Sequence, residues 1–185
     1  MTMLIQSNED LLSAQRQGKE FKFVYFWGHR KPQQGIAKSC FSQWYEAPFY
    51  EGNTCFLTAE HYMMYQKAKT FDNHDIAEKI LVCKTPGEAK KLGRNVVGFD
   101  EQIWREVRYN IVVQANVLKF SQHSDMKAFL SNTGDRILVE ASPVDRIWGI
   151  GLSADDPKVD QVNQWQGLNL LGYALMKTRQ LINEL

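Results

Sequence analysis

A glutamate and a lysine lie seven positions apart in the stretch TAEHYMMYQKA, from Thr58 to Ala68. If this stretch is helical, positions 60 and 67 differ by about 20° in azimuth and about 10 Å along the axis, so Glu60 and Lys67 share one stripe. Tyrosines and methionines surround them and leave little polar face. A carboxylate on this stripe suits a base, a nucleophile or a stabiliser of positive charge, and the amine suits a nucleophile.

Two interpretations of this pair remain open. The charges are either solvated or paired elsewhere on an ordinary amphipathic helix, or both line a site. In a first helical turn, the helix dipole favours the ionised form of Glu60, which argues against a general acid. Apolar neighbours lower the pKa of Lys67, whereas a nearby carboxylate raises it, and the sequence leaves that balance open.

Capping signals outline several helices after residue 57. Thr58 is the expected N-cap of a helix that runs to about Lys69. Asp72, with Asp75 three residues on, opens a helix over IAEKILV. TPGEAKKLG forms a capping box with proline at the first turn and Gly93 as the stop.

Two longer helices complete this half of the chain. Asp100 caps the longest one, through about Phe120, and Phe99 and Trp104 are placed as a hydrophobic staple. The last helix is expected to begin near Val162. Its apolar stripe comprises Leu168, Leu171, Leu175 and Ile182.

The β component is small. FKFVYFW, residues 21–27, and DRILVEAS, residues 135–142, are expected strands. Residues 40–59 suggest a short hairpin that turns at Glu51-Gly52-Asn53. We therefore expect a helix-rich α+β fold, with residues 1–18 as an N-terminal arm and residues 19–185 as a single domain.

Composition narrows the function classes. The 185 residues carry a net charge of +1, which gives no bulk attraction to nucleic acid or to an anionic membrane. Three cysteines without a CxxC pair argue against a disulfide framework and a zinc site. Neither a signal peptide nor a stretch of about 20 apolar residues is recognisable, so we expect a cytoplasmic protein.

Seven separated blocks give the chain a family resemblance. From about Phe21 to the C-terminus it resembles the NADAR family, to which the YbiA-type N-glycosidases belong. The resemblance implies a compact α+β fold, no metal or redox cofactor, and cleavage of N-glycosidic bonds of ribose. The blocks are VYFWGH, TAEHYMMYQKA, LGRNV, the tryptophan of DEQIWREVRYNIV, LKFSQH, LVEASPVDRIWGIG and WQGLNLLGYALMKTRQ.

The resemblance implies two substrate classes. One branch of the family hydrolyses phosphoribosylamino-pyrimidine intermediates of riboflavin synthesis, and another removes ADP-ribose from guanine in nucleic acid. A non-catalytic module that binds ADP-ribose or a related nucleotide is a third possibility. We expect a small-molecule substrate or a single modified guanine as the partner, with no membrane and no obligate protein partner.

The resemblance also assigns residues to the site. It gives Glu60, Lys67 and Asp145 catalytic roles, and it gives substrate-binding roles to Trp104, Trp148, Arg94, Trp27 and Gly28. In this scheme Glu60 stabilises C1 or activates water, and Asp145 assists proton transfer. Lys67 either forms a Schiff base with the opened ribose or binds phosphate.

Each further residue has a structural alternative. Asp145 is also suited to an Asx-type turn, since S-P-x-D is a turn sequence. Trp104 is also a staple partner of Phe99, Trp148 a lid over the core, and Arg94 an ion-pair partner of a carboxylate. The sequence departs from many family members at Ser42-Gln43-Trp44, where a contact with the base would alter substrate preference.

Overall fold

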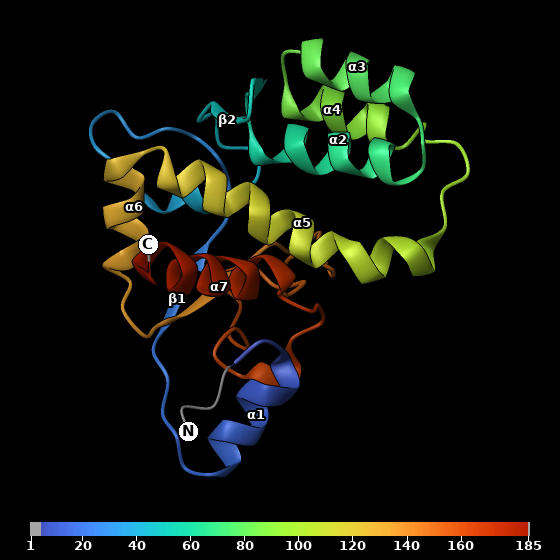
Figure 1. Cartoon of the computed structure of the whole chain (residues 1–185). Helices are drawn as coiled ribbons and strands as arrows, with labels where there is room; N and C mark the ends of the chain where they lie inside the picture. Colours follow the sequence, from blue (N-terminus) through green and yellow to red (C-terminus); the bar gives the residue numbers. More distant parts are fainter. Residues whose placement is uncertain (1–4, 185) are drawn as a thin grey trace.

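The computed structural model describes residues 5–184, which form a helix-rich α+β domain with two small sheets (Figure 1). This confirms the predicted fold class. The helices are α1 (Asn8–Arg16), α2 (Ala59–Thr70), α3 (His74–Val82), α4 (Pro86–Gly93), α5 (Glu101–Ser121), α6 (Ser124–Ser131) and α7 (Leu170–Glu184), with short 3-10 turns at Lys38–Phe41 and Val162–Gln164. The strands are β1 (Phe23–Phe26), β2 (Phe49–Glu51), β3 (Thr54–Phe56) and β4 (Ile137–Glu140).

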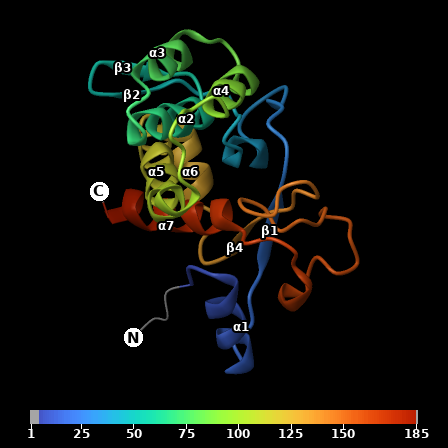
Figure 2. The same cartoon turned by 90° about the vertical axis from the view of Figure 1, so that its right-hand side faces the viewer.

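Helices α5 and α7 pack against each other through the middle of the molecule (Figure 1). Helices α2, α3 and α4 form a group on the far side of α5, and α7 covers β4 (Figure 2). The main hydrophobic core lies between these elements. Its fully buried members include Phe41, Ile80, Val112, Phe120, Leu138 and Leu175.

Strand β4 separates two hydrophobic clusters. It pairs in parallel with β1, with Phe23 opposite Ile137 and Phe26 opposite Glu140. Because successive side chains of a strand point to opposite faces, Leu138 joins the main core, while Ile137 and Val139 join a second cluster. Leu11 of α1 is fully buried in that second cluster. The boundary proposed between residues 18 and 19 stays a prediction, and residues 1–4 of the arm lie outside the described residues.

The structure confirms most of the predicted helix caps and the predicted hairpin turn. The side chain of Thr58 accepts a hydrogen bond from the His61 N–H, and Asp100 accepts bonds from the N–H groups of Gln102 and Ile103. The capping box at the start of α4 is complete. Antiparallel pairing of β2 with β3 leaves Gly52 and Asn53 as the loop, as predicted, but residues 40–48 are not strand.

Two predicted helix starts are wrong. Helix α3 begins at His74, because Asp72 has a left-handed backbone, with φ of 55°. Helix α7 begins at Leu170 and not near Val162. Asn169 has φ of 54° and bonds β4 through its amide, which accepts from the Glu140 N–H and donates to the Leu138 carbonyl. Leu168 lies before the helix and is half exposed, outside the buried stripe.

Candidate active site

A cavity of about 270 Å³ opens where α2, α4, the start of α5 and the end of β4 meet. Six residues assigned from the sequence line it together: Glu60, Lys67, Asp145, Arg94, Trp104 and Trp148. Trp27 and Gly28 are not among the lining residues; Trp27 is 59% exposed, and Gly28 has φ of 84°. Their binding roles stay predictions.

Glu60 lies in the first turn of α2 and is only 4% exposed. Its N–H donates to the Gln43 carbonyl at 3.0 Å, which ties the start of the helix to the neighbouring loop. Burial raises the pKa of Glu60 to about 7; Lys90 opposes this shift and Asp145 adds to it. Burial therefore acts against the ionised form of Glu60 that a first helical turn favours.

Lys67 lies at the other end of the stripe, among aromatic rings. Its Nζ is 4.3 Å from the ring centroid of Phe99 and 5.8 Å from that of Trp104. Burial lowers the pKa of Lys67, while Glu101 and, more weakly, Glu60 oppose that shift. Glu60 and Lys67 do not form an ion pair within 4.0 Å. Within residues 5–184, the ion pairs are those of Glu101 with Arg105 and Arg108. The amine thus stays free to meet a ligand.

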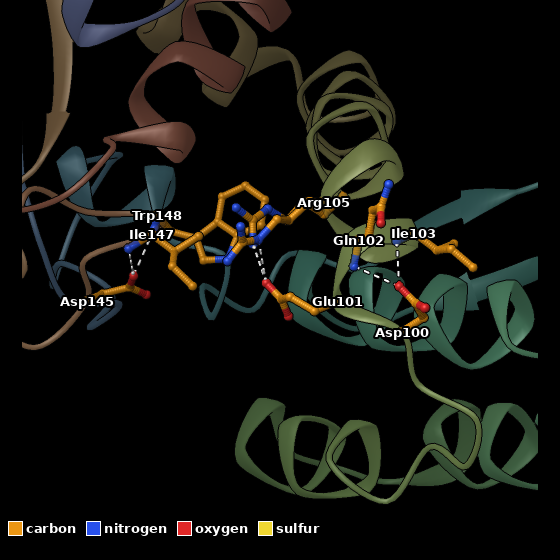
Figure 3. A network of polar contacts seen from close by, with 9 residues as sticks. Asp100, Glu101, Gln102, Ile103, Arg105, Asp145, Ile147 and Trp148 are labelled. Carbon is orange, nitrogen blue, oxygen red and sulfur yellow. Dashed lines mark hydrogen bonds and ion pairs between the residues drawn. The ribbon is translucent and has the colours of Figure 1, made fainter.

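Asp145 forms the predicted turn and also lines the cavity, while its catalytic role stays a prediction. Its Oδ1 accepts hydrogen bonds of 2.8 Å from the N–H groups of Ile147 and Trp148, which is an Asx-type turn (Figure 3). The same side chain lines the cavity. A Cβ at Gly149 would lie 2.9 Å from the Glu140 carbonyl oxygen and 3.0 Å from that of Asp145, so only glycine lets the loop fold back this closely.

The first turn of α5 forms the opposite rim. Glu101 pairs with Arg105 at 2.9 Å and with Arg108 at 3.6 Å, and the side chains of Ile147 and Trp148 lie on the side of their loop that faces this turn (Figure 3). These pairs account for the exposed charges at the helix start. Trp104, from the same turn, is only 7% exposed and lines the cavity.

Helix α4 and the residue that caps its C-terminus supply two cations to the cavity. Lys90 and Arg94 are four residues apart, so they lie on one face of α4, and both line the cavity. The Nζ of Lys90 is 5.8 Å from the ring centroid of Trp44. A Cβ at Gly93, between them, would overlap the Met64 side chain of α2, so any other residue there requires Met64 to move. This close approach of α4 to α2 places the cations beside Glu60.

Among the other lining residues, Lys90 and Glu140 are charged and were given no role from the sequence, and Trp44 was considered only as part of the Ser42-Gln43-Trp44 loop. Glu140 had a recognisable signal, because it is the polar last residue of an apolar strand, and ligands meet parallel strands at their carboxyl ends. Lys90 had the i, i+4 spacing to Arg94. Trp44 lay in the loop that departs from the family pattern, and the cavity wall includes all of Ser42, Gln43 and Trp44.

A buried lysine holds that loop in place. Lys119 of α5 is fully buried, and its Nζ donates to the carbonyls of Cys40 at 2.7 Å and Ser42 at 3.0 Å. Burial lowers the pKa of Lys119 to about 7. Its two hydrogen bonds make the Lys119 amine a fixed donor beneath the cavity wall, and it does not line the cavity.

The cavity gathers three acidic side chains, Glu60, Glu140 and Asp145, and three basic ones, Lys67, Lys90 and Arg94. Such an arrangement can stabilise positive charge at a sugar carbon on one side and bind an anion on the other. No three His, Cys, Asp or Glu side chains of residues 5–184 are grouped to hold a metal ion. Over the same range, no helix is long and apolar enough to cross a bilayer.

Comparisons with known proteins agree with the resemblance. The NADAR domain model matches residues 25–183. An N-glycosidase of Acanthamoeba polyphaga mimivirus is 42% identical over 164 residues, covering 86% of this chain and 95% of that protein. A chloroplastic riboflavin biosynthesis protein of Zea mays is 34% identical over 132 residues, covering 68% of this chain and 19% of that protein.

The fold agrees as well. The NMR structure of the E. coli protein YbiA matches with a TM-score of 0.71 and 25% identity, covering 90% of this chain and 88% of that one. The family model spans most of the chain, and the mimivirus protein is matched over nearly its whole length. The chain therefore belongs to the NADAR family.

Proposed function

We propose that the chain is an N-glycosidase that hydrolyses the ribose C1–N bond of a phosphoribosylamino-pyrimidine and releases ribose 5-phosphate. The observation that carries the proposal is the cavity in which Glu60 and Lys67 lie with the two cations of α4. The names of the mimivirus and Zea mays relatives support the reaction type and the substrate class, respectively.

The chemistry follows from the arrangement of charges. Cleavage at ribose C1 passes through an oxocarbenium-like state, which a carboxylate stabilises. Glu60 takes this role or removes a proton from the attacking water. Arg94 and Lys90 bind the 5-phosphate, because a guanidinium and an ammonium on one helix face match a dianion. This leaves Lys67, in its apolar surroundings, as the amine that attacks an opened ribose or as a further phosphate ligand.

A second candidate is the removal of ADP-ribose from guanine in nucleic acid. Exposed apolar side chains around the cavity favour it. Phe99, beside Lys67, is 40% exposed, and Ile147, which lines the cavity, is also 40% exposed. Such surfaces can pack on a larger substrate than a single phosphoribosyl pyrimidine, and a cavity of this kind holds one extruded nucleotide without a basic groove.

Release of ribose 5-phosphate tests the proposal directly. Freshly prepared phosphoribosylamino-pyrimidines are incubated with the wild type, with Glu60→Gln, and with Glu106→Gln, an exposed acid on the outer face of α5, as the control. We expect fast release by the wild type and the control and almost none by Glu60→Gln. If the wild type releases nothing from this substrate but frees ADP-ribose from modified guanine, the second candidate holds. Binding of either ligand without turnover indicates a non-catalytic module.

A further inference from the structure

Glu140 is the last residue of β4, and its backbone is held from several sides. Its N–H donates to the Asn169 amide oxygen at 3.0 Å, and its carbonyl accepts from the Ile150 N–H at 3.0 Å. The next residue, Ala141, donates its N–H to Phe26 of β1 at 2.9 Å. These bonds fix the direction in which the side chain leaves the strand, and that side chain lines the cavity.

The carboxyl group itself lacks a partner. Its Oε2 is buried and makes no hydrogen bond to any residue in the range 5–184. A buried polar oxygen without a partner costs about 1–3 kcal/mol, so native structures seldom leave one without a reason. A ligand in the cavity would supply the missing partner.

The neighbours of Glu140 favour its neutral form. Two other acids face it, Glu60 from α2 and Asp145 from the loop after β4, and Lys90 of α4 is the cation that acts against them. Burial together with these acids raises the pKa of Glu140 to about 8. At neutral pH the side chain is therefore a carboxylic acid with an O–H to donate.

We propose that Glu140 is the general acid of the site and protonates the nitrogen that leaves ribose C1. Asp145 differs in that its Oδ1 is already held by two backbone N–H groups of its own turn, so only its Oδ2 is available to a ligand. Glu140 is neither paired nor capped, and it shares the cavity with Glu60. This role rests on the proposed N-glycosidase function.

The step balances as a hydrolysis. The C1–N bond breaks with its electron pair moving to nitrogen, and the proton of Glu140 goes to that nitrogen to give the free amine. Water forms the new C1–O bond and gives one proton to Glu60. The products are ribose 5-phosphate and the aminopyrimidine, with Glu140 as carboxylate and Glu60 as acid, and proton exchange with solvent restores both groups.

Two substrates with different leaving groups test whether Glu140 acts as a general acid. One substrate is the phosphoribosylamino-pyrimidine, whose nitrogen has to be protonated as it leaves. The other is 4-nitrophenyl β-ribofuranoside 5-phosphate, whose phenolate leaves without a proton. For Glu140→Gln we expect kcat/KM to fall by about 10²–10⁴-fold with the first substrate and by less than about tenfold with the second. Glu60→Gln should lose activity on both.

The pH profile provides the second measurement. With the amino substrate, the wild type should lose activity above about pH 8, as Glu140 ionises, and Glu140→Gln should lack this limb. Equal losses on both substrates, or no loss on either, would overturn the role of Glu140, and so would an unchanged alkaline limb. A wild type inactive on both substrates would overturn the proposed function itself. Thermal unfolding of Glu140→Gln at pH 6 checks that the variant is folded.

Discussion

Two cavities of this molecule differ in size and in the state of their polar groups. The larger, of about 810 Å³, lies between α7, the end of α6 and the segment around Phe21, and the smaller, of about 270 Å³, is the candidate active site. In the larger cavity, Arg179 donates to Thr133 and to the Arg136 carbonyl, and the Tyr173 hydroxyl donates to Asn8. Its buried polar groups are therefore satisfied by the protein.

The smaller cavity shows the opposite condition. Two of its lining residues carry a buried polar atom that has no hydrogen-bond partner within the range 5–184: Oε2 of Glu140 and Nε2 of Gln43. Polar groups that the protein leaves unsatisfied are groups that a substrate can satisfy. Cavity volume is thus a poor guide to function here, and the state of the polar groups is the better one.

The sharpest test of this contrast is Glu60→Gln in the smaller cavity. We expect kcat to fall by about 10³-fold or more, because the neutral amide can neither stabilise the positive charge at C1 nor accept a proton from water. Initial rates of ribose 5-phosphate release measure this. A loss below about tenfold would remove Glu60 from the mechanism.

Lys67→Met should have the next largest effect. The thioether keeps the apolar packing against Phe99 but removes the amine, so we expect kcat/KM to fall by about 10²-fold. Borohydride added during turnover should trap a covalent sugar adduct in the wild type and none in this variant if the amine is the nucleophile. A raised KM with an unchanged kcat, and no trapped adduct, would instead make Lys67 a phosphate ligand.

Arg179→Met tests the larger cavity. Its guanidinium is 8% exposed, and it serves the Thr133 hydroxyl and the Arg136 carbonyl. Removing it should lower the free energy of unfolding by about 2–3 kcal/mol. The kcat of the folded fraction should not change. Urea unfolding measures the stability, and rates normalised to the folded fraction measure kcat. A loss of kcat in the folded fraction would contradict a purely structural role for Arg179.

Glu60→Gln should also change the free energy of unfolding, but it should raise it, whereas Arg179→Met should lower it. Burial raises the pKa of Glu60 from 4.5 to about 7, so the native state binds this proton more tightly than the unfolded chain does. Stability therefore falls as the pH rises from about 4.5 to about 7, and the glutamine variant escapes this loss. At pH 8 we expect the variant to be more stable by on the order of 2 kcal/mol, and at pH 4 to be equal to the wild type. Urea unfolding at the two pH values decides this.

The smallest effect is expected at the loop that departs from the family pattern. Gln43→Asn, which shortens one side chain of the cavity wall, should change the ratio of kcat/KM between two base analogues by about threefold to tenfold. The shorter side chain withdraws the oxygen that accepts from the Asn116 amide, whereas the bond from the Glu60 N–H goes to the Gln43 main-chain carbonyl and does not involve the side chain. An equal change for both analogues would show that the loop positions Glu60 and does not contact the base.

The sequence predicts the parts of this site that depend on local signals. Glu60 and Lys67 follow from helical spacing, and the ends of α2, α4 and α5 follow from their caps. Glu140 has a local signal as the polar end of an apolar strand, but its place in the cavity, like that of Trp44, depends on tertiary contacts that no local pattern records. The start of α7 was missed for the same reason, since Asn169 uses its amide to bond β4 across the fold.

The parallel pairing of β1 with β4 also sets the order in which the molecule can assemble. Helices α2, α3 and α4 follow one another directly and can meet early, whereas Phe23 and Ile137 are separated by most of the chain. Closing so long a loop costs entropy before any contact compensates for it, so this pairing is expected to form late. Glu140 reaches the cavity only when β1 and β4 have paired. A partly folded chain would therefore have Glu60 and Lys67 in place on α2 but would lack Glu140 beside them. Activity should therefore return later than helical structure during refolding.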